Sequence, residues 1–144
     1  MITEVTNTFN ILTHNGRITI ENRASGDYRT FQIKTQPKDS NFMPGLRLVG
    51  LLTGADNENN YENFGILQPS GHITLWRKHR NSSTFIYFCD MLLNPVKYEN
   101  LKAPKAPLGY AYHYEGRCRV CNRALTTPES ILSGIGPVCA GREE

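Results

Sequence analysis

The first hundred residues alternate hydrophobic and polar side chains in a way that predicts β-strands. In GRITIEN, Ile18 and Ile20 are separated by polar residues, and in YRTFQIKT Phe31 and Ile33 repeat the pattern. Such alternation places every second side chain on one face of a sheet. The RASGD segment between them is rich in turn residues, so the two runs are predicted to form a β-hairpin.

Two more patterns extend the predicted sheet. The segment GLRLVGLLTG is almost continuously apolar between glycines, which indicates a buried strand. In FGILQPSGHITLW, two short apolar runs flank a Pro-Ser-Gly turn, which predicts a second hairpin.

The hydrophobic period changes in NSSTFIYFCDMLLNP. Apolar side chains recur there at i, i+3, i+4 and i+7, in the order Phe85, Phe88, Cys89, Leu92. This spacing predicts a helix with one face in the core, capped by the serine pair and ended by Asn-Pro. Cys89 lies on that face, where a buried hydrophobic role is favoured over that of a ligand or nucleophile.

The prolines and glycine of LKAPKAPLG exclude a continued helix or central strand, and they indicate a connector over residues 102–109. We therefore predict an α+β fold in two parts. Residues 1–101 form an antiparallel, β-rich domain with one core helix, and residues 110–144 form a small zinc-binding module.

Three of the four cysteines fall in the last part of the chain. Cys118 and Cys121 form C-x2-C, Cys139 follows, and His113 precedes the pair. In C-x2-C two thiolates of one tight turn reach a single tetrahedral ion. Binding of a structural zinc would replace a hydrophobic core that so short a segment cannot build. Free thiols or a redox C-x2-C are the alternatives.

His113 is the predicted fourth ligand, and other donors remain open. They are His79, Cys89, Glu143, Glu144 and a water molecule. Three thiolates and an imidazole would fill the tetrahedron and leave no position for hydrolytic chemistry. The chain also lacks the H-x-E with P-C-x-x-C of zinc deaminases and the H-E-x-x-H of zinc proteases.

The cysteine-rich segment GRCRVCNRALTTPESILSGIGPVCA resembles an uncharacterised family of bacteriophage and bacterial proteins, the domain of unknown function numbered six thousand and eleven. The matching positions are Gly116, Cys118, Cys121, Arg123, Leu125, Thr126, Pro128, Ser130, Gly134, Gly136, Pro137, Cys139 and Ala140. The resemblance implies a zinc-binding element in a phage-like setting, and it implies no reaction.

Charge is unevenly distributed along this chain of net charge +3. Residues 77–123 carry nine Lys or Arg and three Asp or Glu, whereas residues 1–76 carry six and seven. A basic segment of this kind suits nucleic acid, with DNA favoured over RNA. The candidate phosphate contacts are Arg77, Lys78, Arg80, Arg117, Arg119 and Arg123.

Two other functions remain open. A phage-encoded inhibitor would bind and block a host defence or replication protein, anchored by aromatic residues such as Tyr61, Phe64 or the run Tyr110 to Tyr114. A metal-dependent nuclease would use the carboxylates of Asp56, Glu58 and Glu62, although a polar surface loop is the favoured interpretation.

The start of the chain shows neither a basic, apolar leader nor an amphipathic presequence. We therefore expect a protein of the host bacterial cytoplasm. In that reducing compartment closely spaced cysteines favour metal binding over disulfides.

Overall fold

The computed structural model describes residues 14–56 and 60–117. In chain order the elements are β1 (Asn15–Asn22), β2 (Tyr28–Thr35), β3 (Arg47–Leu52), β4 (Tyr61–Leu67), β5 (Ile73–Leu75), the 3₁₀ turn η1 (Arg77–His79), α2 (Ser83–Leu93), α3 (Pro95–Glu99) and β6 (Tyr110–Arg117). Both predicted hairpins, the buried strand and the helix are confirmed.

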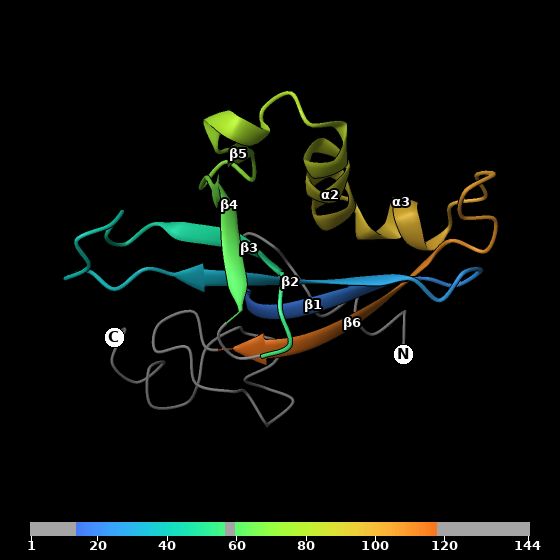
Figure 1. The fold of residues 1–144 in the computed structure, drawn as a ribbon, viewed down its shortest axis with the longest axis horizontal. Helices are drawn as coiled ribbons and strands as arrows, with labels where there is room; N and C mark the ends of the chain where they lie inside the picture. Colours follow the sequence, from blue (N-terminus) through green and yellow to red (C-terminus); the bar gives the residue numbers. More distant parts are fainter. Residues whose placement is uncertain (1–13, 57–59, 118–144) are drawn as a thin grey trace.

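The strands form one antiparallel sheet in the order β5-β4-β3-β2-β1-β6 (Figure 1). Neighbours in sequence are neighbours in the sheet except for β6, which returns after the helices and pairs with β1 along its eight residues. Strand β1 therefore lies inside the sheet. The fold is α+β with a β-rich core, as predicted.

Residues 110–117, assigned from the sequence to the zinc module, form β6 and so belong to the sheet. The proposed division into two domains stays a prediction, because residues 118–144 lie outside the described part of the chain. In the connector, Gly109 has φ 74°, and a Cβ there would lie 2.3 Å from the Glu99 carbonyl oxygen. The tight return into β6 therefore requires glycine.

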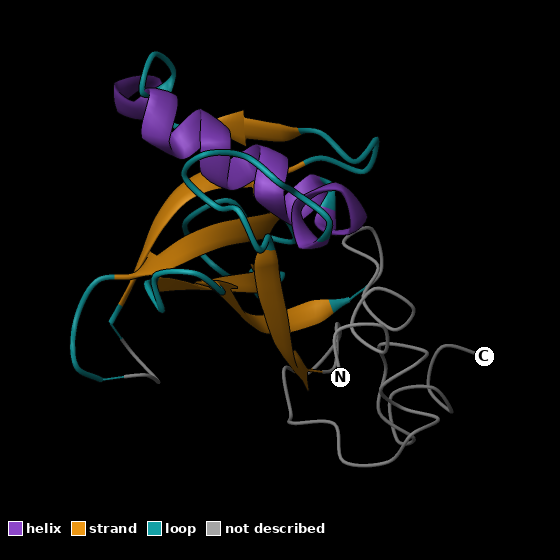
Figure 2. Cartoon of the chain, turned by 90° about the vertical axis from the view of Figure 1, so that its right-hand side faces the viewer, coloured by secondary structure: helices purple, strands orange, loops and turns teal. Residues whose placement is uncertain are grey.

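Helices α2 and α3 cover one face of the sheet (Figure 2). The Ser82 side chain caps α2 by accepting from the Phe85 amide, which satisfies one of the N–H groups left free at a helix start. The buried face carries Phe88, Cys89 and Leu92, as the period predicts, together with Met91. Across the described chain no helix has the length and apolar character needed to cross a bilayer.

The core lies between α2 and the sheet. The Phe31 ring of β2 is fully buried and meets the Phe88 ring edge-on at 5.1 Å and the Phe64 ring at 6.2 Å. A register shift between Val49 and Gly50 lets the opposing strand β4 carry one extra residue, Phe64. The Phe64 side chain is 1% exposed and lies in the core, so the prediction that it is an exposed anchor was wrong.

Candidate functional site

The cations Arg77, Lys78 and Arg80 lie together on and directly after η1, between edge strand β5 and α2, and all three are exposed. The Lys78 ammonium lies 3.6 Å from a Glu62 carboxylate oxygen, and Arg80 Nε donates to the Leu75 carbonyl oxygen at 3.4 Å. Ion pairs between such exposed side chains contribute little, so Lys78 can exchange Glu62 for a phosphate. We call these three residues the basic turn.

Aromatic rings flank the basic turn on both sides. Trp76, directly before it, meets the Phe42 ring at 6.3 Å and 82°, and Phe42 is 51% exposed. His79 stacks on Phe85 at 4.0 Å, which anchors the turn to the start of α2. The turn thus displays cations next to accessible rings, an arrangement suited to phosphates and unpaired bases.

The fourth predicted cation, Arg117, does not join the basic turn. It ends β6, and β5 and β6 are opposite edges of the sheet. Its Nη2 donates to Glu115 Oε1 at 2.8 Å, and its side chain is 18% exposed. Arg119 and Arg123 lie outside the described residues.

His113 lies on β6 with an exposed imidazole, and its Nε2 is 3.5 Å from a Glu21 carboxylate oxygen. Carboxylates commonly orient zinc-binding histidines through the nitrogen that does not bind the ion. This side chain therefore fits the predicted role, with Nδ1 left for a metal. Cys118, Cys121 and Cys139 fall outside the described residues, and among residues 14–56 and 60–117 no three potential ligands cluster.

The acidic loop proposed for a nuclease is described only in part. Glu62 is exposed on β4 and pairs with Lys78, and Asp56 accepts the Asn60 amide through its carbonyl oxygen. Glu58 lies outside the described residues, so the triad of carboxylates remains a prediction.

One arrangement of side chains was not predicted from the sequence. The register aligns His113, Thr19 and Thr30 across β6, β1 and β2, and Leu52 and Tyr61 continue this line on β3 and β4. The line lies on the face opposite the helices, and we call it the transverse row. The alternation in the first hairpin predicts polar positions at Thr19 and Thr30, but only the β1–β6 pairing brings His113 beside them.

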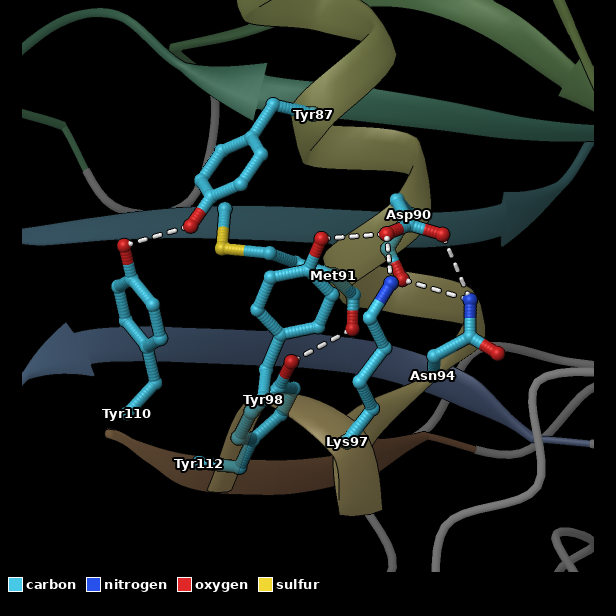
Figure 3. Close-up of polar contacts among 8 residues, drawn as sticks. All are labelled: Tyr87, Asp90, Met91, Asn94, Lys97, Tyr98, Tyr110 and Tyr112. Atoms are coloured by element: carbon cyan, nitrogen blue, oxygen red, sulfur yellow. Dashed lines mark hydrogen bonds and ion pairs between the residues drawn. The ribbon is translucent and has the colours of Figure 1, made fainter. Parts of the chain in front are cut away.

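Four tyrosines lie at the junction of α2, α3 and β6 (Figure 3). The Tyr112 hydroxyl donates to the Met91 carbonyl oxygen at 2.6 Å. That carbonyl would ordinarily accept from the residue four positions later, which is Pro95 and has no N–H. The Tyr87 and Tyr110 hydroxyls share a hydrogen bond of 3.0 Å. Tyr110 and Tyr112 thus hold the helices to the sheet. Because Tyr112 is 2% exposed, the prediction that the run Tyr110 to Tyr114 forms an exposed anchor was wrong for Tyr112.

Asp90 is the charged centre of this junction. Its carboxylate accepts from the Tyr98 hydroxyl, from Lys97 at 3.0 Å and from Asn94 at 2.8 Å. The Tyr98 hydrogen bond, followed by those of Lys97 and Asn94, lowers the pKa of Asp90. Burial and the Asp90 contact raise the pKa of Tyr98. Each group is therefore fixed in its ordinary charge state, which suits a structural role.

Two buried titratable groups lie near these contacts. Burial raises the pKa of the Cys89 thiol to about 11, so it stays protonated at neutral pH, as expected of a buried hydrophobic residue. Burial also raises the pKa of Glu99, and the charge of Arg23 partly opposes that shift.

Comparison with known proteins gives a family match for the end of the chain. No curated protein and no solved structure matches the chain. Residues 113–143 match a family of unknown function (DUF6011), which confirms the resemblance predicted from the C-terminal motif.

Proposed function

We propose that the protein is a non-enzymatic, zinc-binding accessory protein that binds nucleic acid. The basic turn carries this proposal, because it presents exposed cations beside the accessible rings of Trp76 and Phe42. Cations of this kind neutralise phosphates and release counterions, while aromatic rings stack on bases without regard to sequence.

Trp76 gives a direct readout, because it is the chain's single tryptophan. Titration of the full chain with a single-stranded DNA oligonucleotide is expected to change its fluorescence, and the affinity is expected to fall steeply with salt. An RNA and a duplex of matched length measure the preference for DNA. No binding of any of them at low salt would contradict the proposal.

The variant to compare is Arg77→Ala with Lys78→Ala. Its matched control is Lys102→Ala with Lys105→Ala, which removes the same charge from exposed residues at the other end of the fold (Figure 1). Each lost phosphate contact lowers the slope of log affinity against log salt by about 0.7 on single strands. In the basic-turn variant the slope should therefore fall by about twice this amount, because two contacts are lost. In the control variant the slope should equal that of the wild type.

We further propose that Cys118, Cys121, Cys139 and His113 hold a single structural zinc ion. The exposed His113 imidazole, oriented by Glu21, supports this ligand set. Elemental analysis should find zinc in the wild type and in Cys89→Ala, and should find it lost from Cys139→Ser. Equal zinc in Cys139→Ser and the wild type would contradict the assignment, and zinc retained in His113→Ala would assign the fourth position to another donor.

A second candidate function is that of a phage-encoded inhibitor that binds a host protein. A groove of about 680 Å³ lies between edge strand β5 and α2, lined mostly by apolar side chains that include Leu75 and the half-exposed Ile86. Such grooves accept segments of partner proteins. In a co-purification from bacterial lysate, Ile86→Asp should lose a partner that Val96→Asp, changed at an exposed position of α3, retains. A partner kept by both variants would exclude the groove.

A further inference from the structure

A cavity of about 770 Å³ opens on the transverse row, on the sheet face opposite the helices. It is lined by Thr19 and Thr30, which are paired on adjacent strands and which we call its floor, and by Tyr28, Tyr61 and His113. Sites for small molecules usually measure about 300–1,000 Å³. The cavity is therefore large enough for a nucleoside-sized group.

The floor of the cavity offers directional hydrogen bonds. The Thr19 and Thr30 hydroxyl oxygens lie 2.9 Å apart, and one hydroxyl donates a hydrogen bond to the other. A hydroxyl both donates and accepts, so each retains capacity for a ligand in the cavity. Hydroxyls presented side by side can meet the donor and acceptor atoms on the edge of a planar ring.

The charges around the cavity offset one another. Arg17 lies 3.7 Å from Glu115, which also accepts from Arg117, and the Glu21 carboxylate beside His113 supplies a second negative charge. Mutual neutralisation leaves little net attraction for a phosphate. The site suits an uncharged, polar, planar ligand.

The Tyr28 ring supplies a stacking surface, since it is 62% exposed at the rim of the cavity. On the far side, the Arg17 guanidinium lies 5.7 Å from the centre of the Tyr61 ring and holds that ring in place. We propose that this cavity binds one unpaired nucleobase, with its face on Tyr28 and its edge at Thr19 and Thr30.

This assignment rests on the proposed function and specifies its ligand as single-stranded nucleic acid. The basic turn and the cavity adjoin the same strand. β5 pairs with β4 only over Gly65–Leu67, so the first half of β4 forms the sheet edge there. Lys78 reaches Glu62 at that edge, and the next residue, Tyr61, lines the cavity. A single-stranded nucleic acid whose phosphates lie on the basic turn can thus place a base in the cavity.

The test compares Tyr28→Ala with Tyr28→Phe on three probes of equal length: a single-stranded oligonucleotide, an abasic oligonucleotide and a duplex. Loss of a base stacked on an aromatic ring weakens binding by about fivefold or more. Tyr28→Ala should show that loss on the single strand alone, whereas Tyr28→Phe should bind like the wild type. Equal affinity of Tyr28→Ala and wild type for the single strand, or an equal loss on the abasic strand, would overturn the inference.

A free nucleoside separates this inference from the proposed function, because it has no phosphate for the basic turn. Titration with thymidine or adenosine should shift the NMR signals of the Thr19 and Thr30 methyl groups, also in the Arg77→Ala, Lys78→Ala variant. Unchanged methyl signals with both nucleosides would overturn the cavity assignment even where salt-dependent oligonucleotide binding persists. Shifted signals without oligonucleotide binding would overturn the proposed function alone.

Discussion

Strand β1 shows how differently the two faces of the sheet are used. Ile18 and Ile20 are 1% and 3% exposed and lie in the core, whereas Arg17 and Thr19 alternate with them and point to the cavity on the other face. The first face gains its stability from buried apolar area, and the second holds paired charges and hydroxyls. Substitutions on the second face can therefore change binding while the fold persists.

The sharpest test of this contrast is Phe31→Ala beside Thr30→Ala, two neighbours on β2. Phe31 is fully buried among aromatic rings, so its removal leaves a cavity and is expected to cost about 3–5 kcal/mol. Thr30 lies on the other face, and its loss is expected to cost less than about 1 kcal/mol. Denaturant unfolding followed by circular dichroism measures both, and similar costs would refute the division between the faces.

Tyr112→Phe removes a single oxygen from the helix-covered face. The Met91 carbonyl then loses its donor, and Pro95 offers no replacement. An unsatisfied buried carbonyl costs about 1–3 kcal/mol. Tyr114→Phe, which loses a donor to the Asn15 carbonyl of the adjacent strand, is the companion variant. A Tyr112→Phe protein as stable as the wild type would show that the Met91 carbonyl finds another donor.

Asp90→Asn tests the charge at the helix junction. Because the folded protein lowers the pKa of Asp90, the carboxylate stabilises the fold above its unfolded pKa, and this contribution is lost as pH falls through the folded pKa. The variant should be less stable near neutral pH, because it loses the charge of the carboxylate. The expected loss is only about 1 kcal/mol, since Asp90 is partly exposed and water screens its interactions. The difference should shrink in acid, as measured by unfolding at several pH values. A pH-independent difference would assign the effect to packing.

Glu99→Gln should change the stability of the fold in the opposite direction, and we expect this change to be the smallest. Burial raises the pKa of Glu99, so its contribution is present below the unfolded pKa and is lost as pH rises through the folded pKa. Near neutral pH the variant is expected to gain up to about 1 kcal/mol, and in acid to match the wild type. A loss of stability at neutral pH would show instead that the ionised carboxylate, facing Arg23, stabilises the fold.

Local patterns predicted much of this fold, because each depends on residues close in sequence. Alternation located the strands of the first hairpin, and short apolar runs around a turn located those of the second. The helical period placed Phe88 and Leu92 in the core. The exposed cluster at Arg77 was also predicted, since neighbouring cations share one turn. The C-terminal motif predicted the family match that begins at His113.

Features that join distant residues were missed. The pairing of β1 with β6 links Thr19 to His113, and nothing local in either strand specifies it. The register shift that gives β4 an extra residue at Phe64 is also not revealed by alternation. The cavity depends on both the strand order and the pairing. The sequence therefore showed Thr19 and Thr30 only as ordinary polar positions, and it assigned His113 and Tyr61 to other roles.

The late return of β6 also bears on how the protein is made. During synthesis β1 to β5 leave the ribosome before β6. Strand β1 therefore remains an edge strand until residues 110–117 emerge. Exposed edges of this kind can pair with other chains, and contacts between distant segments form slowly. Completion of the sheet by β6 is thus expected to be the last slow step of folding, and nascent chains that end before it are expected to be prone to aggregation.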